Sequence, residues 1–129
     1  MLDASAIGEY LLRTELGLQV ETIIEEPDAR LNVPAICDVE VCSALRRTIR
    51  SGELQPSQAV EALAVYLALP ITRYGHTALV GRIFELRDNF AASDAAYVAL
   101  CEQLSATLVT CDNRLTRLVQ QRLPLNVIG

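Results

Sequence analysis

Four acidic residues stand where the sequence pattern places ends of strands or starts of helices. Asp112 follows an apolar, β-branched run of strand length, residues 107–111, and Asp94 opens a predicted helix. Asp3 follows two apolar residues that can be only the end of a strand, and Glu40 lies near the start of another predicted helix. The carboxyl ends of parallel strands share one edge of an α/β sheet, and ligands bind at that edge. We therefore expect these four acids to meet there.

Carboxylates gathered in one place predict a metal site. They repel one another, which raises their pKa values and lowers stability unless a cation neutralises them. Hard oxygen ligands without Cys or His partners indicate Mg²⁺ or Mn²⁺, and we expect Asp3, Asp94 and Asp112 to bind the ion. Such an ion can orient and acidify a water for attack on a phosphodiester, which is nuclease chemistry. Ser5 and Thr110 are expected to orient the carboxylates or metal-bound water through their hydroxyl groups.

The elements that must position these acids alternate between strands and helices. Short apolar or β-branched runs predict strands at residues 30–33, 71–74, 107–111 and 125–128, after a clipped strand at 1–3. Helical periodicity and stop signals predict helices at residues 4–12, 17–26, 35–50, 56–69, 76–86, 94–104 and 113–121. The alternation predicts a three-layer α/β/α sandwich with a central, mostly parallel sheet.

Length and composition set further limits. A chain of 129 residues that is 51% hydrophobic suits one domain, residues 1–129. No apolar run reaches the roughly 18 residues that cross a bilayer, and the start lacks the pattern of a signal peptide, so we expect a cytoplasmic protein with no membrane partner. The net charge of −5 gives no general basic field, so contact with nucleic acid must come from local arginines or a metal.

The four cysteines carry no pattern of a disulfide framework or a zinc site. Cys37, Cys42, Cys101 and Cys111 lie within apolar or helical segments, without CxxC spacing or a histidine cluster. They are predicted to be buried, reduced thiols that pack as small apolar groups.

Four segments carry a family resemblance when they are taken together in chain order. They are LDASA (Leu2–Ala6), P-x₅-E-V-x₃-L-R (Pro34–Arg46), DAAYVALCEQL (Asp94–Leu104) and TLVTCDNRL (Thr107–Leu115). The chain resembles a PIN domain, and is most similar to small bacterial toxins of the VapBC type. The resemblance implies a metal-dependent endoribonuclease, usually a homodimer, which a small cognate VapB-like antitoxin neutralises by occluding the site.

Matching the motifs position by position selects the acids already derived from spacing and charge. The family pattern assigns Asp3, Glu40, Asp94 and Asp112 as catalytic acids and Thr110 as the hydroxyl of the T-x-D element. The chain departs from the pattern in one respect, because family members usually carry several apolar residues before the first aspartate and only two stand here. The pairing of the first strand is therefore less determined than the position of its aspartate.

Each acid also has a purely structural interpretation. Ser93 is the predicted N-cap, and Asp94, which follows it, could have no role beyond complementing the helix dipole. Asp112 could cap the following helix, bind a metal, or do both. Glu40 could be a solvated surface charge, with Asp38 as an alternative acid on a different helical face.

The basic and aromatic residues are open to two interpretations. Near the acids lie four arginines that could hold RNA phosphates or simply form solvated helix faces: Arg46, Arg47, Arg114 and Arg117. His76, the single histidine, lies outside all four motifs and is predicted to be structural or exposed. Tyr97 is expected to pack in the core.

Other functions for a cluster of acids are less compatible with the sequence. A phosphoacceptor domain usually relies on a lysine, and a P-loop requires G-x-x-x-x-G-K-[ST], yet all eleven basic residues are arginine. A catalytically inactive PIN-like module that binds another protein remains the alternative. Retention of all four acids argues against it, because without a metal they only add repulsion.

Overall fold

A computed structural model describes all 129 residues, Met1–Gly129. The helices are α1 (Ala4–Leu11), α2 (Glu15–Ile24), α3 (Ile36–Arg50), α4 (Pro56–Ala68), α5 (Val80–Glu85), α6 (Ala92–Leu104) and α7 (Asn113–Arg122), with a short 3-10 helix, η1 (Thr77–Leu79), before α5. The strands are β1 (Leu31–Pro34), β2 (Ile71–Tyr74), β3 (Leu108–Val109) and β4 (Val127–Ile128). This order confirms the predicted mixed α/β class.

The strands pair in parallel, as the alternation of strands and helices predicted. β1 pairs with β2, and β3 pairs with β4. Leu2 forms one parallel bridge to Val109, so the first residues contribute a single bridge and no full strand. The structure therefore has two separate strand pairs where one continuous central sheet was expected.

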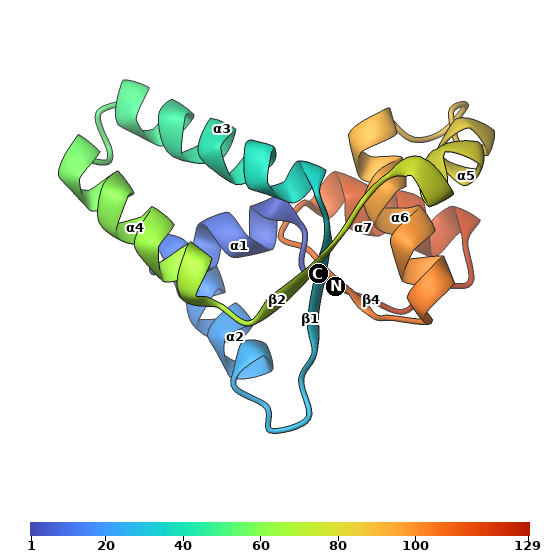
Figure 1. Ribbon diagram of the computed structural model, residues 1–129, viewed down its shortest axis with the longest axis horizontal. Helices are drawn as coiled ribbons and strands as arrows, with labels where there is room; N and C mark the ends of the chain where they lie inside the picture. The colour runs from blue at the N-terminus through green and yellow to red at the C-terminus, as the bar shows by residue number, and fades with distance from the viewer.

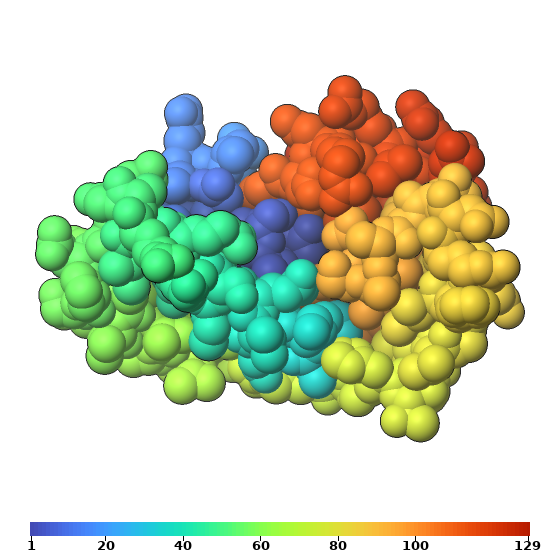
Figure 2. All heavy atoms as spheres, turned by 90° about the horizontal axis from the view of Figure 1, so that it is seen from above, coloured from blue at the N-terminus to red at the C-terminus, as the bar shows by residue number.

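The strands lie between two groups of helices. Figure 1 shows α1, α2, α3 and α4 on one side of the strands and α5, α6 and α7 on the other. Viewed from above, the beginning of the chain lies between α3, α6 and α7, which places α1 at the meeting point of the two groups (Figure 2). This arrangement agrees with the predicted α/β/α layers.

Helix α6 runs through the core. Every residue from Ala95 to Cys101 is buried, and most of them belong to one cluster of 25 buried apolar residues. The alanines of this segment leave room for neighbouring elements to approach closely. The start of α6 is thereby held in a fixed place, and Asp94 lies in its first turn.

Helices α1 and α2 also approach closely, and this approach requires a glycine. A Cβ atom at Gly17 would lie 2.1 Å from the backbone oxygen of Glu9. Any side chain there would push α2 away from α1. The hydroxyl of Thr14, the N-cap of α2, accepts from the Gly17 amide at 3.0 Å and fixes the same corner.

All four cysteines are free thiols. Cys37 and Cys101 are buried as predicted and Cys111 is partly buried, but the prediction was wrong for Cys42, which is exposed. Cys42 follows the buried Val41 on α3, and neighbouring residues of a helix point in different directions, so its side chain leaves the core stripe. None of the helices combines the length and apolar character that crossing a membrane requires.

Candidate active site

One cavity of about 390 Å³ is lined by all four acids that the sequence singled out. Each comes from a different element: Asp3 precedes α1, Glu40 lies on α3, Asp94 lies in the first turn of α6, and Asp112 precedes α7. The remaining lining residues are Ala4, Ser5, Ser43, Ala44, Arg47 and Tyr97. The predicted convergence of four distant segments is thus present in the tertiary structure.

Asp3 is the most buried of these acids and is held by three donors. Its Oδ1 accepts hydrogen bonds from the Ser5 hydroxyl at 2.6 Å and from the Ala6 amide at 2.9 Å, and its Oδ2 accepts one from the Thr110 hydroxyl. Burial raises the pKa of Asp3, these hydrogen bonds oppose the rise, and the charge of Asp112 adds to it. The side chain therefore has a fixed orientation, and its negative charge is costly at neutral pH.

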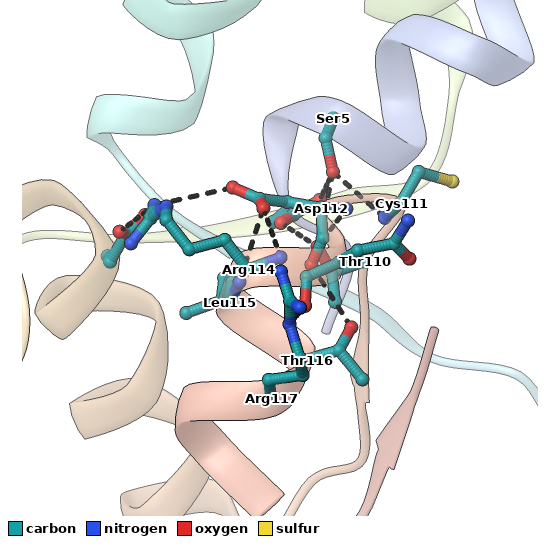
Figure 3. Close-up of polar contacts among 11 residues, drawn as sticks. Ser5, Thr110, Cys111, Asp112, Arg114, Leu115, Thr116 and Arg117 are labelled. Carbon is teal, nitrogen blue, oxygen red and sulfur yellow. Dashed lines mark hydrogen bonds and ion pairs between the residues drawn. The ribbon is translucent and has the colours of Figure 1, made fainter.

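Two hydroxyl groups connect Asp3 to the end of β3. Thr110, whose hydroxyl donates to Asp3, also accepts from the Asp112 amide at 3.0 Å. Ser5 accepts from the Cys111 amide at 2.9 Å (Figure 3). The amide of Thr110 still donates to the Ile128 carbonyl at 3.0 Å, but the Cys111 amide donates to a side chain, and β3 is shorter than predicted. Both hydroxyls donate to the carboxylate of Asp3.

Asp112 is the N-cap of α7. Its Oδ1 accepts from the amides of Arg114 at 2.8 Å and Leu115 at 3.2 Å. These bonds satisfy two amides that the first helical turn leaves without a helical partner. The second oxygen, Oδ2, lies free of the cap, so capping and binding a ligand are compatible roles for this residue.

Asp94 lies within the first turn of α6, but Ser93 is not its N-cap. The helix begins at Ala92, and the N-cap residue is Ala91, which makes no side-chain hydrogen bond. A capping side chain contributes only about 1 kcal/mol, and burial of seven consecutive α6 residues outweighs it. The side chain of Asp94 is 17% exposed, so it is largely buried but can still be reached by a ligand.

Arg114 bridges two of the acids. Its Nη2 donates to Asp94 Oδ2 at 2.8 Å and to Asp112 Oδ2 at 3.3 Å. Figure 3 shows the Arg114 side chain extending from the start of α7 towards the neighbouring helix. The hydrogen bond and charge of Asp94, followed by the charge of Asp112, raise the pKa of Arg114. This arginine, predicted as a possible RNA contact, is therefore engaged within the site.

Glu40 is oriented by a residue whose role the sequence did not reveal. The Tyr97 hydroxyl donates to Glu40 Oε1 at 2.7 Å. Burial raises the pKa of Glu40, this hydrogen bond opposes the rise, and the charges of Asp94 and Asp3 add to it. Tyr97 is buried as predicted, but it also lines the cavity. Tyr97 follows Asp94 by three residues on the same helix, a spacing that makes the two side chains neighbours, and this was the sequence signal for its position in the site.

Asp38, the alternative to Glu40, lies outside the cavity. It accepts hydrogen bonds from Tyr66 at 2.5 Å and from Arg73 at 2.8 Å. Arg73 also lies over the Tyr66 ring, 5.3 Å from its centre. These contacts tie α3 to α4 and β2, and they leave Glu40 as the acid of α3 that faces the site.

The other sequence candidates divide between the cavity and the surface. Arg47 lines the acidic cavity and a neighbouring cavity of about 380 Å³. Arg46 is exposed and lines neither cavity, and Arg117 donates to the carbonyl of Asn113 on its own helix. His76 accepts a hydrogen bond from the Ile36 amide at 3.0 Å through Nε2, so it caps α3 as a structural residue.

The donor chemistry of the cavity fits a hard divalent cation. Its acidic lining supplies only carboxylate oxygens, and a guanidinium already lies between two of them, so positive charge is stabilised at this place. No group of three His, Cys, Asp or Glu side chains is placed to hold a metal ion in this arrangement, in which Arg114 contacts Asp94 and Asp112. Mg²⁺ usually binds through one or two carboxylates and keeps several of its waters.

The sequence as a whole matches one described family. The PIN domain family matches residues 1–120. A VapC ribonuclease of Mycobacterium bovis is 41% identical over 128 residues, which cover 99% of this chain and 97% of the relative. Ribonuclease VapC12 of Mycobacterium tuberculosis is 33% identical over 117 residues, covering 91% of this chain and 89% of the relative.

The chain belongs to the PIN domain family. Its similarity to relatives named VapC ribonucleases extends over nearly the full length of both chains.

Proposed function

We propose that this chain is a metal-dependent endoribonuclease, the toxin of a type II toxin–antitoxin system, which hydrolyses RNA with a carboxylate-bound Mg²⁺ or Mn²⁺. The observation that carries the proposal is that four acids from distant segments line one cavity in a PIN domain chain. Relatives named VapC ribonucleases support the same activity. We propose that residues 1–129 act as a single nuclease domain.

The four acids would have two roles: three would hold the metal ion, and one would accept a proton. Asp3, Asp94 and Asp112 would hold the ion, which would activate a water and neutralise charge that develops on the phosphate. Glu40 would accept the proton of the attacking water at Oε2, because Oε1 already accepts from Tyr97. Burial raises the pKa of Glu40, which brings this carboxylate closer to the range in which a general base is effective.

The arginines around the cavity would hold the RNA backbone. Arg47 is the best supported of them, because it lines both the acidic cavity and its neighbour and so could bind a phosphate beside the reacting one. Arg46 and Arg117 would contact phosphates farther along the strand. A net charge of −5 makes such local contacts necessary for binding a polyanion.

Partners follow from the same assignment. We propose a small cognate VapB-like antitoxin that occludes the acidic cavity, a homodimer as the working form, and a cytoplasmic location. In living cells, expression of the chain alone should stop growth, and co-expression of the antitoxin should restore it. A variant without nuclease activity should leave growth unaffected.

The direct test is cleavage of RNA by the purified protein. We expect cleavage with Mg²⁺ or Mn²⁺, none with EDTA, and a loss of at least about a hundredfold in Asp94→Asn, since even groups outside the ligand shell contribute 10–100-fold to metal sites. Asp88→Asn, an exposed aspartate in the turn before α6, is the matched control and should cleave normally. Equal cleavage by Asp94→Asn would contradict the mechanism. Absence of cleavage with every metal would favour the inactive protein-binding module.

A further inference from the structure

Arg114 is a cation that the chain itself places in the acidic site. Its Nη2 contacts Asp94 Oδ2 and Asp112 Oδ2 at 2.8 and 3.3 Å. The Arg114 side chain is 55% exposed, against 17% for Asp94 and 34% for Asp112, so the guanidinium lies on the solvent side of both carboxylates. It partly neutralises the pair and covers it from outside.

The position of Arg114 on its helix is otherwise unfavourable. It is the second residue of α7, where the helix dipole presents its positive end and favours acidic side chains. A cation at this point does not stabilise the helix. The contacts of Arg114 with the two carboxylates compensate for its unfavourable interaction with the helix dipole. The location of the charge is explained by the acids it bridges and not by α7.

The oxygens that Arg114 contacts are the ones a metal would need. Asp112 Oδ1 already accepts two backbone amides, so Oδ2 is the oxygen left for a ligand. Arg114 occupies that oxygen and, with the same nitrogen, Oδ2 of Asp94. Asp94 and Asp112 would therefore hold a divalent ion with carboxylates that Arg114 now contacts.

Building on the proposed function, we infer that Arg114 is the internal counter-ion of the Asp94–Asp112 pair and competes with the divalent cation. The ion binds only when the guanidinium releases both carboxylates. Arg114 is thus a positioning residue that keeps the acids paired in the metal-free protein and lowers their affinity for metal. The exposed side chain can swing away without disturbing the core.

The test is Mn²⁺ binding to the metal-free protein by titration calorimetry, without RNA. Arg114→Gln removes the competing charge, and we expect it to bind Mn²⁺ about two- to tenfold more tightly, as for the loss of one or two exposed ion pairs. Arg114→Lys keeps the charge and should stay closer to the parent. Arg122→Gln is the matched control on the same helix, because this exposed arginine lies in the last turn of α7, away from the acids, and its affinity should not change.

Salt supplies an independent readout. Exposed ion pairs are screened by salt, so the difference between Arg114→Gln and the parent should shrink as NaCl rises from about 0.05 to 0.5 M. Thermal unfolding of each variant shows whether it is folded.

Equal or weaker Mn²⁺ binding by folded Arg114→Gln would overturn the competition while leaving the proposed nuclease intact. If neither the parent nor any variant binds Mn²⁺, the site does not bind metal, and both the inference and the proposed function are contradicted. If Arg114→Gln does not fold, Arg114→Lys is the deciding variant. It keeps the positive charge, so an increase in Mn²⁺ affinity as large as the one expected for Arg114→Gln would overturn the inference.

Discussion

Thr110 offers a quantitative test of how the acidic site is held together. Its side chain is 2% exposed, and its hydroxyl donates to Asp3 Oδ2 while accepting from the Asp112 amide at 3.0 Å. Thr110→Val preserves the shape and removes both bonds, together with the 3.2 Å contact between the Thr110 and Ser5 hydroxyls. A hydrogen bond to a charged group contributes about 1.5–3 kcal/mol, and an amide left without a partner costs about 1–3 kcal/mol. The added methyl group returns about 0.8 kcal/mol.

We therefore expect Thr110→Val to lose about 2–5 kcal/mol in the free energy of unfolding. Thr110→Ser is the matched control: it keeps the hydroxyl, loses one methyl group, and should lose about 1 kcal/mol. Urea unfolding at pH 7, followed by circular dichroism, measures both as shifts of the midpoint at constant slope.

The pH dependence of the difference gives a second check on the same contact. The Thr110 hydrogen bond lowers the pKa of Asp3, so it stabilises the charged carboxylate. The gap between Thr110→Val and Thr110→Ser should therefore be largest at neutral pH and should narrow as the pH falls and Asp3 takes up a proton. A valine variant as stable as the serine variant at pH 7 would refute the assignment of this network.

Three further predictions concern other residues of the site and its support. Tyr97→Phe should reduce kcat by about 10–100-fold, since a hydrogen bond to a charged group contributes about 1.5–3 kcal/mol. It should also raise the pKa of Glu40 and move the acidic limb of the pH–rate profile to higher pH, and an unchanged profile would contradict this contact. Burial raises the pKa of Asp3 above its ordinary value of 3.8, so this group favours the folded state below that pH, and the contribution is lost as the pH rises through the folded value. The stability of the parent relative to Asp3→Asn should therefore increase as the pH falls from 7 towards 3, and a difference in melting temperature that does not change with pH would count against this assignment. His76→Ala should lose about 1 kcal/mol in urea unfolding because the Ile36 amide loses its acceptor, whereas an unchanged midpoint would mean that water replaces the ring.

The sequence predicted the architecture well where local signals were strong. Helix α4 begins at Pro56 as expected, since proline is favoured in a first turn, and strand β2 occupies the predicted residues 71–74. The predicted strand at 107–111 is shortened to two residues, and the amide of Cys111 donates to the Ser5 hydroxyl, a tertiary contact, and not to a neighbouring strand. Propensity alone carries no information about such a contact.

The sequence identified the acids of the candidate site and the two hydroxyl partners of Asp3, but not the contacts that Tyr97 and Arg114 make. The positions of Asp3, Glu40, Asp94 and Asp112 followed from strand ends and helix starts, whose side of the fold is fixed by topology. The role of Arg114 did not follow, because an exposed arginine can adopt many conformations and the sequence does not say which acids lie within its reach.

The amino-acid order by itself determined an α/β chain with carboxylates at the edges of its elements, because periodicity, caps and turn residues act over a few neighbouring positions. The tertiary structure alone decided that Tyr97 holds Glu40 and that Arg114 bridges Asp94 and Asp112, because these contacts join segments that are brought together only by packing of the core.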